Sequence, residues 1–235
     1  MVQRVVYRQE GEVMISLKDT GLFREVEPFE IQKMMKCSGA VTKEYKAGDY
    51  IFREEDMPQF LYLILEGEVS IVKDFTTGRQ DILYVAGVGN VFGEDFFCPE
   101  QKPYWFNAVA NSKSIILLFP WRFFFGFCSN ACEHHQQLIR NMLEIMAVRS
   151  FDMTKKAHIL SSTTLREKIS VWLLESMKDG VVDTGMNREQ MAAYLGVTRP
   201  SLSREMMKMQ KEGIIEIDKG KILICDEERL HNPIE

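Results

Sequence analysis

Basic and hydroxyl side chains that donate hydrogen bonds recur at short intervals near the C-terminal end of this sequence: Arg199, Ser201, Ser203, Arg204 and Lys208. A guanidinium donates two parallel hydrogen bonds to one planar acceptor edge, whereas an ammonium or a hydroxyl group makes single bonds, commonly to phosphate oxygens. One acid, Glu205, lies among them, so the local charge is positive although the whole chain has a net charge of -5. This combination is typical of a surface that binds the backbone and base edges of DNA.

The residues around these donors predict two short helices separated by a tight turn. Asn187 is a good N-cap, and Gln190 three residues later completes a box that satisfies the first free backbone amides. Gly196 supplies the left-handed residue that ends the first helix. Thr198 then caps a second helix, whose first turn tolerates Pro200 because that nitrogen would make no helical hydrogen bond. This order of elements indicates a helix-turn-helix.

The second helix carries Leu202, Met206 and Met209 on one face, which is expected to point inward and leave the donors exposed. Residues 214–224 follow and partly alternate between apolar and polar around Asp218-Lys219-Gly220, the composition of a tight hairpin. A helix-turn-helix followed by a hairpin is a winged helix. The alternative is a pair of packed helices whose charges are only solvated.

Length and composition favour a soluble protein of two domains, because 235 residues with 46% hydrophobic and 27% charged side chains can bury two ordinary cores. Residues 1–25 lack a signal peptide, and no segment is apolar enough to span a membrane. We expect a cytoplasmic protein with no membrane partner. The five cysteines predict no disulfide framework, but Cys128 and Cys132 have helical spacing and form a redox candidate, with ordinary packing as the alternative.

The first half of the chain has the texture of a small barrel or jelly roll. Between residues 43 and 120, short β-branched and aromatic runs alternate with glycines. The expected strands are 50–52, 60–65, 69–73, 81–85, 108–110 and 114–119. Such closely spaced short strands indicate a β-barrel. With the helices around it, the fold class is α+β.

Three motifs in this half are similar to the cyclic-nucleotide-binding type of barrel: Ala47-Gly-Asp-Tyr-Ile-Phe, Leu61-Tyr-Leu-Ile-Leu-Glu-Gly-Glu-Val and Gly89-Asn-Val-Phe-Gly-Glu. With the winged helix in the same chain order, the sequence resembles the Crp/Fnr family of bacterial transcription regulators over residues 20–226. The resemblance implies three parts: an effector-sensing barrel with N-terminal helices (1–130), a dimerisation helix (131–160) and a DNA-binding domain (161–235).

The resemblance also implies an effector site, which this sequence alters. Family members that bind cyclic AMP place an Arg-Ser pair on the cyclic phosphate, whereas this chain keeps Gly93-Glu94 but has Tyr104-Trp105 at the matching positions. A phenol and an indole cannot neutralise a phosphate, so we expect no cyclic AMP response. An aromatic or apolar effector is expected instead, unless the rings only fill the barrel. The candidate effector-binding residues are Glu94, Phe96, Tyr104, Trp105, Phe106 and Asn107.

No cofactor is expected. Oxygen-sensing relatives carry N-terminal cysteines for an iron–sulfur cluster, and residues 1–36 contain none. Haem-binding relatives use an axial nitrogen from the barrel, but all four histidines lie outside it. The same absence predicts no metal site in the barrel.

Residues 131–160 contain neither Pro nor Gly and permit one long helix. Its apolar or small residues recur at intervals of four and three and predict a dimer seam: Ile139, Leu143, Met146, Ser150, Met153, Ala157 and Leu160. A second stripe, Leu138, Met142, Ile145 and Val148, is expected to pack on a barrel, and residues 161–164 are the expected hinge. The alternative is that both stripes belong to one chain's core.

The family resemblance places Arg199, Pro200 and Arg204 at base-facing positions. Arg204 is expected to read a guanine and Arg199 a base or a phosphate, while Pro200 cannot accept a hydrogen bond from cytosine. The candidate phosphate contacts are Asn187, Arg188, Gln190, Ser201, Ser203 and Lys208.

The leading hypothesis is therefore a homodimeric, effector-gated regulator that binds a two-fold symmetric site in double-stranded DNA and contacts RNA polymerase. A redox-gated regulator that uses Cys128 and Cys132 is one alternative. The other, from a different class, is a jelly-roll enzyme with an accessory winged helix. The sequence offers no nucleophile and base pair for such an enzyme, so we predict that the chain is not one.

Overall fold

The computed structural model describes residues 16–75, 80–94, 102–125, 133–183, 185–218 and 220–232. The chain divides into two compact units, Met1–Ala147 and Val148–Glu235, and each is described by itself. The division falls inside the long helix α3, Glu133–Ser161, so this helix contributes residues to both units. The sequence had predicted one helix over residues 131–160.

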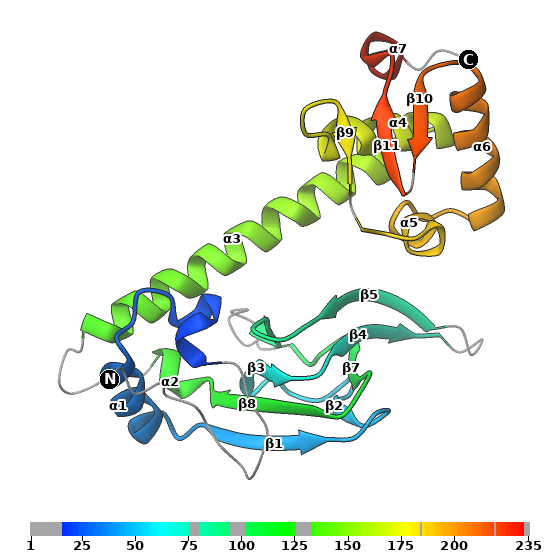
Figure 1. The fold of residues 1–235 in the computed structure, drawn as a ribbon. Coiled ribbons are helices and arrows are strands. Elements are labelled where there is room, and N and C mark those ends of the chain that lie inside the picture. The colour runs from blue at the N-terminus through cyan, green and yellow to red at the C-terminus, as the bar shows by residue number, and fades with distance from the viewer. Residues whose placement is uncertain are drawn as a thin grey trace. The chain divides into compact units, whose positions relative to one another are not determined.

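The first unit is built on two four-stranded sheets (Figure 1). Every pairing within them is antiparallel. In sheet order, the strands of one sheet are β1 (Val41–Tyr45), β8 (Ser114–Pro120), β3 (Phe60–Glu66) and β6 (Val91–Phe92). Those of the other sheet are β2 (Tyr50–Phe52), β7 (Asn107–Ala110), β4 (Val69–Asp74) and β5 (Gln80–Ala86). This is the predicted jelly-roll type of barrel.

Strand β3 is buried on both faces and so contributes side chains to two hydrophobic cores. Successive side chains of a strand point to opposite faces. Tyr62 and Ile64 join the core between the two sheets, whereas Leu61 and Leu63 join a second core beneath the helices. The helical elements of this second core are η1 (Leu17–Asp19), η2 (Gly21–Phe23), α1 (Pro28–Ser38), α2 (Arg122–Phe125) and the first part of α3.

All six strands expected from the sequence are present, and two more had no clear signal. Strand β1 is exposed at nearly every position and carries polar residues, so it lacks the alternation of a half-buried strand. Strand β6 has only two residues, Val91 and Phe92. Its length is too short to give any periodicity.

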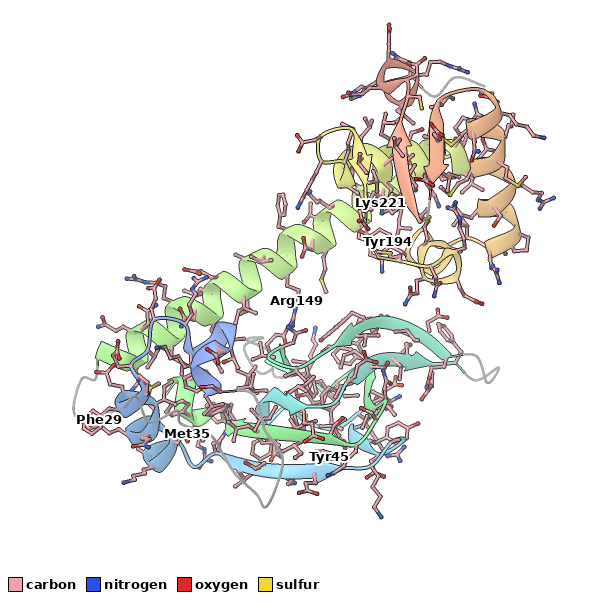
Figure 2. The ribbon with its side chains drawn as sticks, in the orientation of Figure 1. Phe29, Met35, Tyr45, Arg149, Tyr194 and Lys221 are labelled. Carbon is pink, nitrogen blue, oxygen red and sulfur yellow. The ribbon has the colours of Figure 1, made fainter. Side chains whose placement is uncertain are left out.

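The second unit is the predicted winged helix with one additional strand. Its elements are α4 (Leu165–Ser176), β9 (Val181–Val182), α5 (Arg188–Tyr194), α6 (Arg199–Lys211), β10 (Ile215–Asp218), β11 (Lys221–Ile224) and α7 (Glu227–His231). Strands β10 and β11 form the expected hairpin, and β9 pairs with β11 to complete the sheet. Lys221 is labelled on β11 in Figure 2, and its Nζ atom lies 3.0 Å from Oδ2 of Asp183, the residue directly after β9. This ion pair links the additional strand to β11.

Helix α3 presents two different faces. Leu138 and Met142 are buried in the core of the first unit and Ile145 packs against it, as expected for the second stripe, but Val148 is 61% exposed. In the predicted dimer seam, Met146 is partly buried against the same core. The other seam residues are exposed: Ile139, Leu143, Ser150, Met153, Ala157 and Leu160. Among the described residues, no helix is long and apolar enough to cross a membrane.

Replacing Leu138 by Ala should lower the free energy of unfolding by about 2–5 kcal/mol, because it leaves a cavity in a fully buried site. Val148→Ala is the matched control, since that side chain lies on the same helix, is 61% exposed and is not part of the predicted dimer seam. Chemical denaturation at low protein concentration measures both. An equal loss in the two variants would contradict the burial of Leu138.

Candidate nucleic-acid interface

The helix-turn-helix begins with a closed capping box at Asn187. Its side-chain oxygen accepts hydrogen bonds from the amides of Glu189 and Gln190, each at 2.9 Å, and Gln190 Oε1 accepts from the Asn187 amide at 2.9 Å. Thr198 caps α6 by accepting from the Ser201 amide at 3.4 Å. Asn187 and Gln190 therefore use their side chains to start α5, and as phosphate contacts they remain predictions.

Helix α6 separates its apolar and donor faces as the sequence predicted. Leu202, Met206 and Met209 are fully buried. The side chains on the remaining faces are exposed or, for the two serines, half-buried: Arg199, Pro200, Ser201, Ser203, Arg204 and Lys208. Arg204 Nε donates to the Pro200 carbonyl oxygen at 3.3 Å, so the guanidinium lies along the outer face of the first turns. The arrangement offers cations and hydroxyl groups from one helix surface.

Arg188, a predicted phosphate contact, directs its guanidinium toward two methionine sulfur atoms of its own domain. Its Nη1 atom is 3.5 Å from the sulfur of Met191 and also contacts the sulfur of Met206. Burial lowers the pKa of this guanidinium. To reach a phosphate, Arg188 would have to leave these sulfur atoms, a contact that no local sequence pattern predicts.

A buried cation, Arg166 on α4, ties α6 to the rest of the domain. Arg166 Nε donates to Glu205 at 2.6 Å, and its two terminal nitrogens donate to the two oxygens of Glu212 at 2.8 and 3.0 Å. The side chain is only 9% exposed. Hydrogen bonding to Glu212 is the main cause that raises the pKa of Arg166, and the same bond lowers the pKa of the Glu212 carboxyl group.

Arg229 on α7 joins the same cluster. It donates to the backbone oxygen of Glu212 at 2.8 Å and to its carboxylate at 3.3 Å. This cluster was not predicted from the sequence, although the spacing of its two acids is a signal for it. Glu205 and Glu212, the C-cap of α6, are seven residues apart and so lie on the same side of the helix, beside the buried Met209. Two carboxylates next to a buried stripe require a cation from another element.

Replacing Arg166 by Ala should destabilise the second unit by about 3 kcal/mol, because it leaves two carboxylates without their principal cation. This loss is at the lower end of the roughly 3–5 kcal/mol expected when a buried ion pair is broken, because Glu212 is 26% exposed and keeps its ion pair with Arg229. Thermal or chemical unfolding measures the loss. Arg199→Ala is the control, because that side chain is 64% exposed. A variant of Arg166 as stable as this control would refute the clamp.

In the barrel, Tyr104 is buried and takes the centre of an aromatic cluster. Its ring stacks on Phe52 with the centroids 3.8 Å apart, and its hydroxyl group donates to the Gly93 carbonyl oxygen at 3.4 Å. Gly93 has a φ of +78°, and a Cβ there would lie 2.5 Å from the Tyr62 ring and 3.2 Å from the Tyr104 hydroxyl oxygen. The phenol therefore packs directly over the Gly93 backbone, and this position tolerates only glycine.

The structure brings together some of the candidate effector residues and separates others. Tyr104 and Phe106 share the cluster with residues that the sequence analysis did not single out: Phe52, Tyr62 and Phe92. Trp105 is 57% exposed at the edge of this cluster, where its ring packs edge-on against Phe106 with the centroids 5.3 Å apart, and Lys73 donates to its carbonyl oxygen at 2.7 Å. Glu94 is half-buried, and Phe96 lies outside the described residues.

Asn107 is engaged within the barrel. Its side-chain oxygen accepts from the Glu54 amide at 2.8 Å, and its nitrogen donates to Asp74 at 2.9 Å. An effector that used this amide would have to replace one of these bonds. Its role as a polar anchor remains a prediction.

The described residues contain no group of three or more His, Cys, Asp and Glu side chains that could hold a metal ion. The two cysteines of the redox alternative, Cys128 and Cys132, lie outside the described part of the chain.

A double-sheet barrel and a winged helix-turn-helix in one chain define a two-domain class of transcription regulator. Residues 42–131 match the cyclic nucleotide-binding domain family, and residues 167–232 match the Crp-like helix-turn-helix domain family. The chain is 23% identical to the Cyclic AMP receptor protein of Thermus thermophilus over 214 residues, which cover 88% of this chain and 93% of that protein. It is 28% identical to the nitrogen fixation regulation protein FixK of Bradyrhizobium diazoefficiens over 195 residues, 79% of this chain and 78% of that one.

Solved structures agree on the fold. The catabolite activator protein of Thermus thermophilus matches with a TM-score of 0.53 at 20% identity, over 91% of this chain and 97% of that one. A CooA mutant from Carboxydothermus hydrogenoformans matches with a TM-score of 0.61 at 17% identity, over 90% and 92%. The chain belongs to the Crp/Fnr family of DNA-binding transcription regulators.

Proposed function

We propose that this protein is a homodimer that recognises a two-fold symmetric site in double-stranded DNA and regulates transcription through contact with RNA polymerase. The observation that carries the proposal is the outer face of α6, where Arg199, Arg204 and Lys208 are exposed on a helix that is capped at Thr198 and clamped by Arg166. A two-fold dimer presents two such helices to successive major grooves, about 34 Å apart. As a DNA-binding regulator, it acts in the cytoplasm.

The exposed seam of α3 supports the homodimer. Leu143 and Met153 are 62% and 55% exposed, and Ile139 and Leu160 are 41% and 38% exposed. These side chains recur at heptad-like intervals along one helix face, the pattern that a second copy of the same helix covers. In a single chain, this row of apolar side chains would remain exposed to water, which is unfavourable.

We further propose that a small molecule other than a cyclic nucleotide gates DNA binding from the barrel. Tyr104 packs on Gly93 where cyclic AMP-binding relatives are expected to place an arginine, and a buried phenol cannot neutralise a phosphate. Buried rings make the surroundings of Gly93 aromatic, which favours an effector with an aromatic or apolar body. Neither an iron–sulfur cluster nor haem has a part in this mechanism.

Selection of bound sequences from random double-stranded DNA tests both proposals. The purified full chain should enrich inverted repeats whose half-sites are centred one helical turn apart. Enrichment should rise on adding a small-molecule cell extract but not on adding cyclic AMP. If no sequence is enriched under any condition, sequence-specific binding is refuted. If the enrichment is the same with and without the extract, only the proposed effector gate is refuted.

Arg204→Ala should weaken binding to the selected site by about 1–3 kcal/mol and relax one base position, as expected of a bidentate reader. Lys208→Ala should weaken binding to all sequences alike and reduce the salt dependence by about one counterion. Titrations on specific and scrambled DNA at several salt concentrations measure both. If Arg204→Ala kept full discrimination between the two DNAs, its assignment to a base would be wrong.

Leu143→Glu should convert the dimer to a monomer, because it places like charges in the apolar seam. Val148→Glu is the matched control: this residue is 61% exposed on the same helix but lies about 140° around the axis from Leu143. Analytical ultracentrifugation measures the mass of each variant. A dimer that persisted in Leu143→Glu and dissociated in Val148→Glu would place the interface elsewhere on α3.

A further inference from the structure

A large apolar side chain, Met207, lies among the cations and hydroxyl groups on the exposed side of α6. Met207 is 60% exposed, although it lies in the middle of the recognition helix. Among the described residues of the winged helix from α4 onward, the other large exposed apolar side chain is Leu223 on the wing, at 37%. Singly exposed apolar residues are common, so the surroundings of Met207 decide whether its exposure has a role.

Helix geometry puts Met207 beside the predicted base readers. It follows Arg204 by three residues and Ser203 by four, the intervals at which side chains share a helix face. It also lies two turns after Pro200, almost directly in line with it. The buried residues Leu202, Met206 and Met209 occupy the far side of the same helix. Met207 therefore belongs to the surface that a DNA groove would cover.

The chemistry of that surface narrows what Met207 can contact. A methionine cannot bind a phosphate or donate to a base edge, but its flexible thioether packs well on irregular apolar groups. In the major groove, the base edges display one apolar group, the C5 methyl of thymine. Burying an exposed methionine against any other part of the groove would desolvate polar atoms without replacing their hydrogen bonds.

We propose that Met207 is a specificity-determining residue that packs against the methyl group of a thymine. The rise from Arg204 to Met207 is about 4.5 Å along the helix, between one and two base-pair steps, so this thymine lies near the guanine that Arg204 reads. The inference rests on the proposed function, because it requires that α6 enters the major groove of a specific site. Together, Arg204 and Met207 define a short guanine- and thymine-containing core in each half-site.

Single thymines of the selected half-site are replaced by deoxyuracil, which removes only the C5 methyl group, and binding is titrated with the wild type and with Met207→Gln. One replacement should weaken wild-type binding by about fourfold, the factor for one buried methyl group. Met207→Gln keeps the side-chain length and should bind the thymine and deoxyuracil sites equally. Met207→Leu, which keeps an apolar side chain, should still distinguish them.

Met57→Ala is the control for a general loss of an exposed methionine, since Met57 is 48% exposed in the first unit and should leave the thymine effect unchanged. Thermal melting checks that each variant is folded. The inference is overturned if no thymine responds to deoxyuracil, or if the response is the same in Met207→Gln. A failure of the proposed function is a different result, in which no sequence is enriched in the selection.

Discussion

The recognition helix depends on one buried cation. Arg166 is nearly inaccessible to solvent and holds two carboxylates, Glu205 within α6 and Glu212 directly after it, the latter through both of its oxygens. A bidentate bond fixes orientation as well as distance. Two anchors seven residues apart prevent α6 from rotating about its axis, so the direction of its outer face is set from α4.

The same clamp determines the charge that the outer face presents. Glu205 is adjacent to Arg204 in sequence, and an unpaired carboxylate there would attract that guanidinium and repel phosphate. Because Glu205 is bound to Arg166 on the inner side, Arg204 instead lies along the helix with its Nε near the Pro200 carbonyl oxygen. The acidic chain as a whole, with a net charge of -5, thus still supplies a locally basic surface.

Much of this could be predicted from the sequence because the signals were local. Caps at Asn187 and Thr198, the left-handed Gly196 and the apolar stripe of α6 each act within a few residues, and the structure contains all of them. Strand β9 and the Arg166 cluster could not be predicted in the same way, because each depends on partners about 40 residues away in the chain. The barrel shows the same division: its strands had local patterns, but only the fold separates the buried Tyr104 from the exposed Trp105.

The segment that joins α3 to α4 imposes a condition on any gate. The Thr164 side chain accepts from the Glu167 amide at 3.1 Å, and the Glu167 carboxylate accepts from the Thr163 amide, the Thr163 hydroxyl group and the Thr164 amide. These bonds lower the pKa of Glu167. The expected hinge therefore contains a capping box, which a movement within these residues either preserves or breaks.

A small effector shifts the population of DNA-binding dimers only by the difference between its affinities for the two arrangements of the hinge. Motion that preserves the box needs a smaller difference, because the cap bonds cancel between the two states. Of the expected hinge residues 161–164, Ser161 ends α3 and Thr163 and Thr164 take part in the capping box, so a rotation at Ser162 leaves both elements intact.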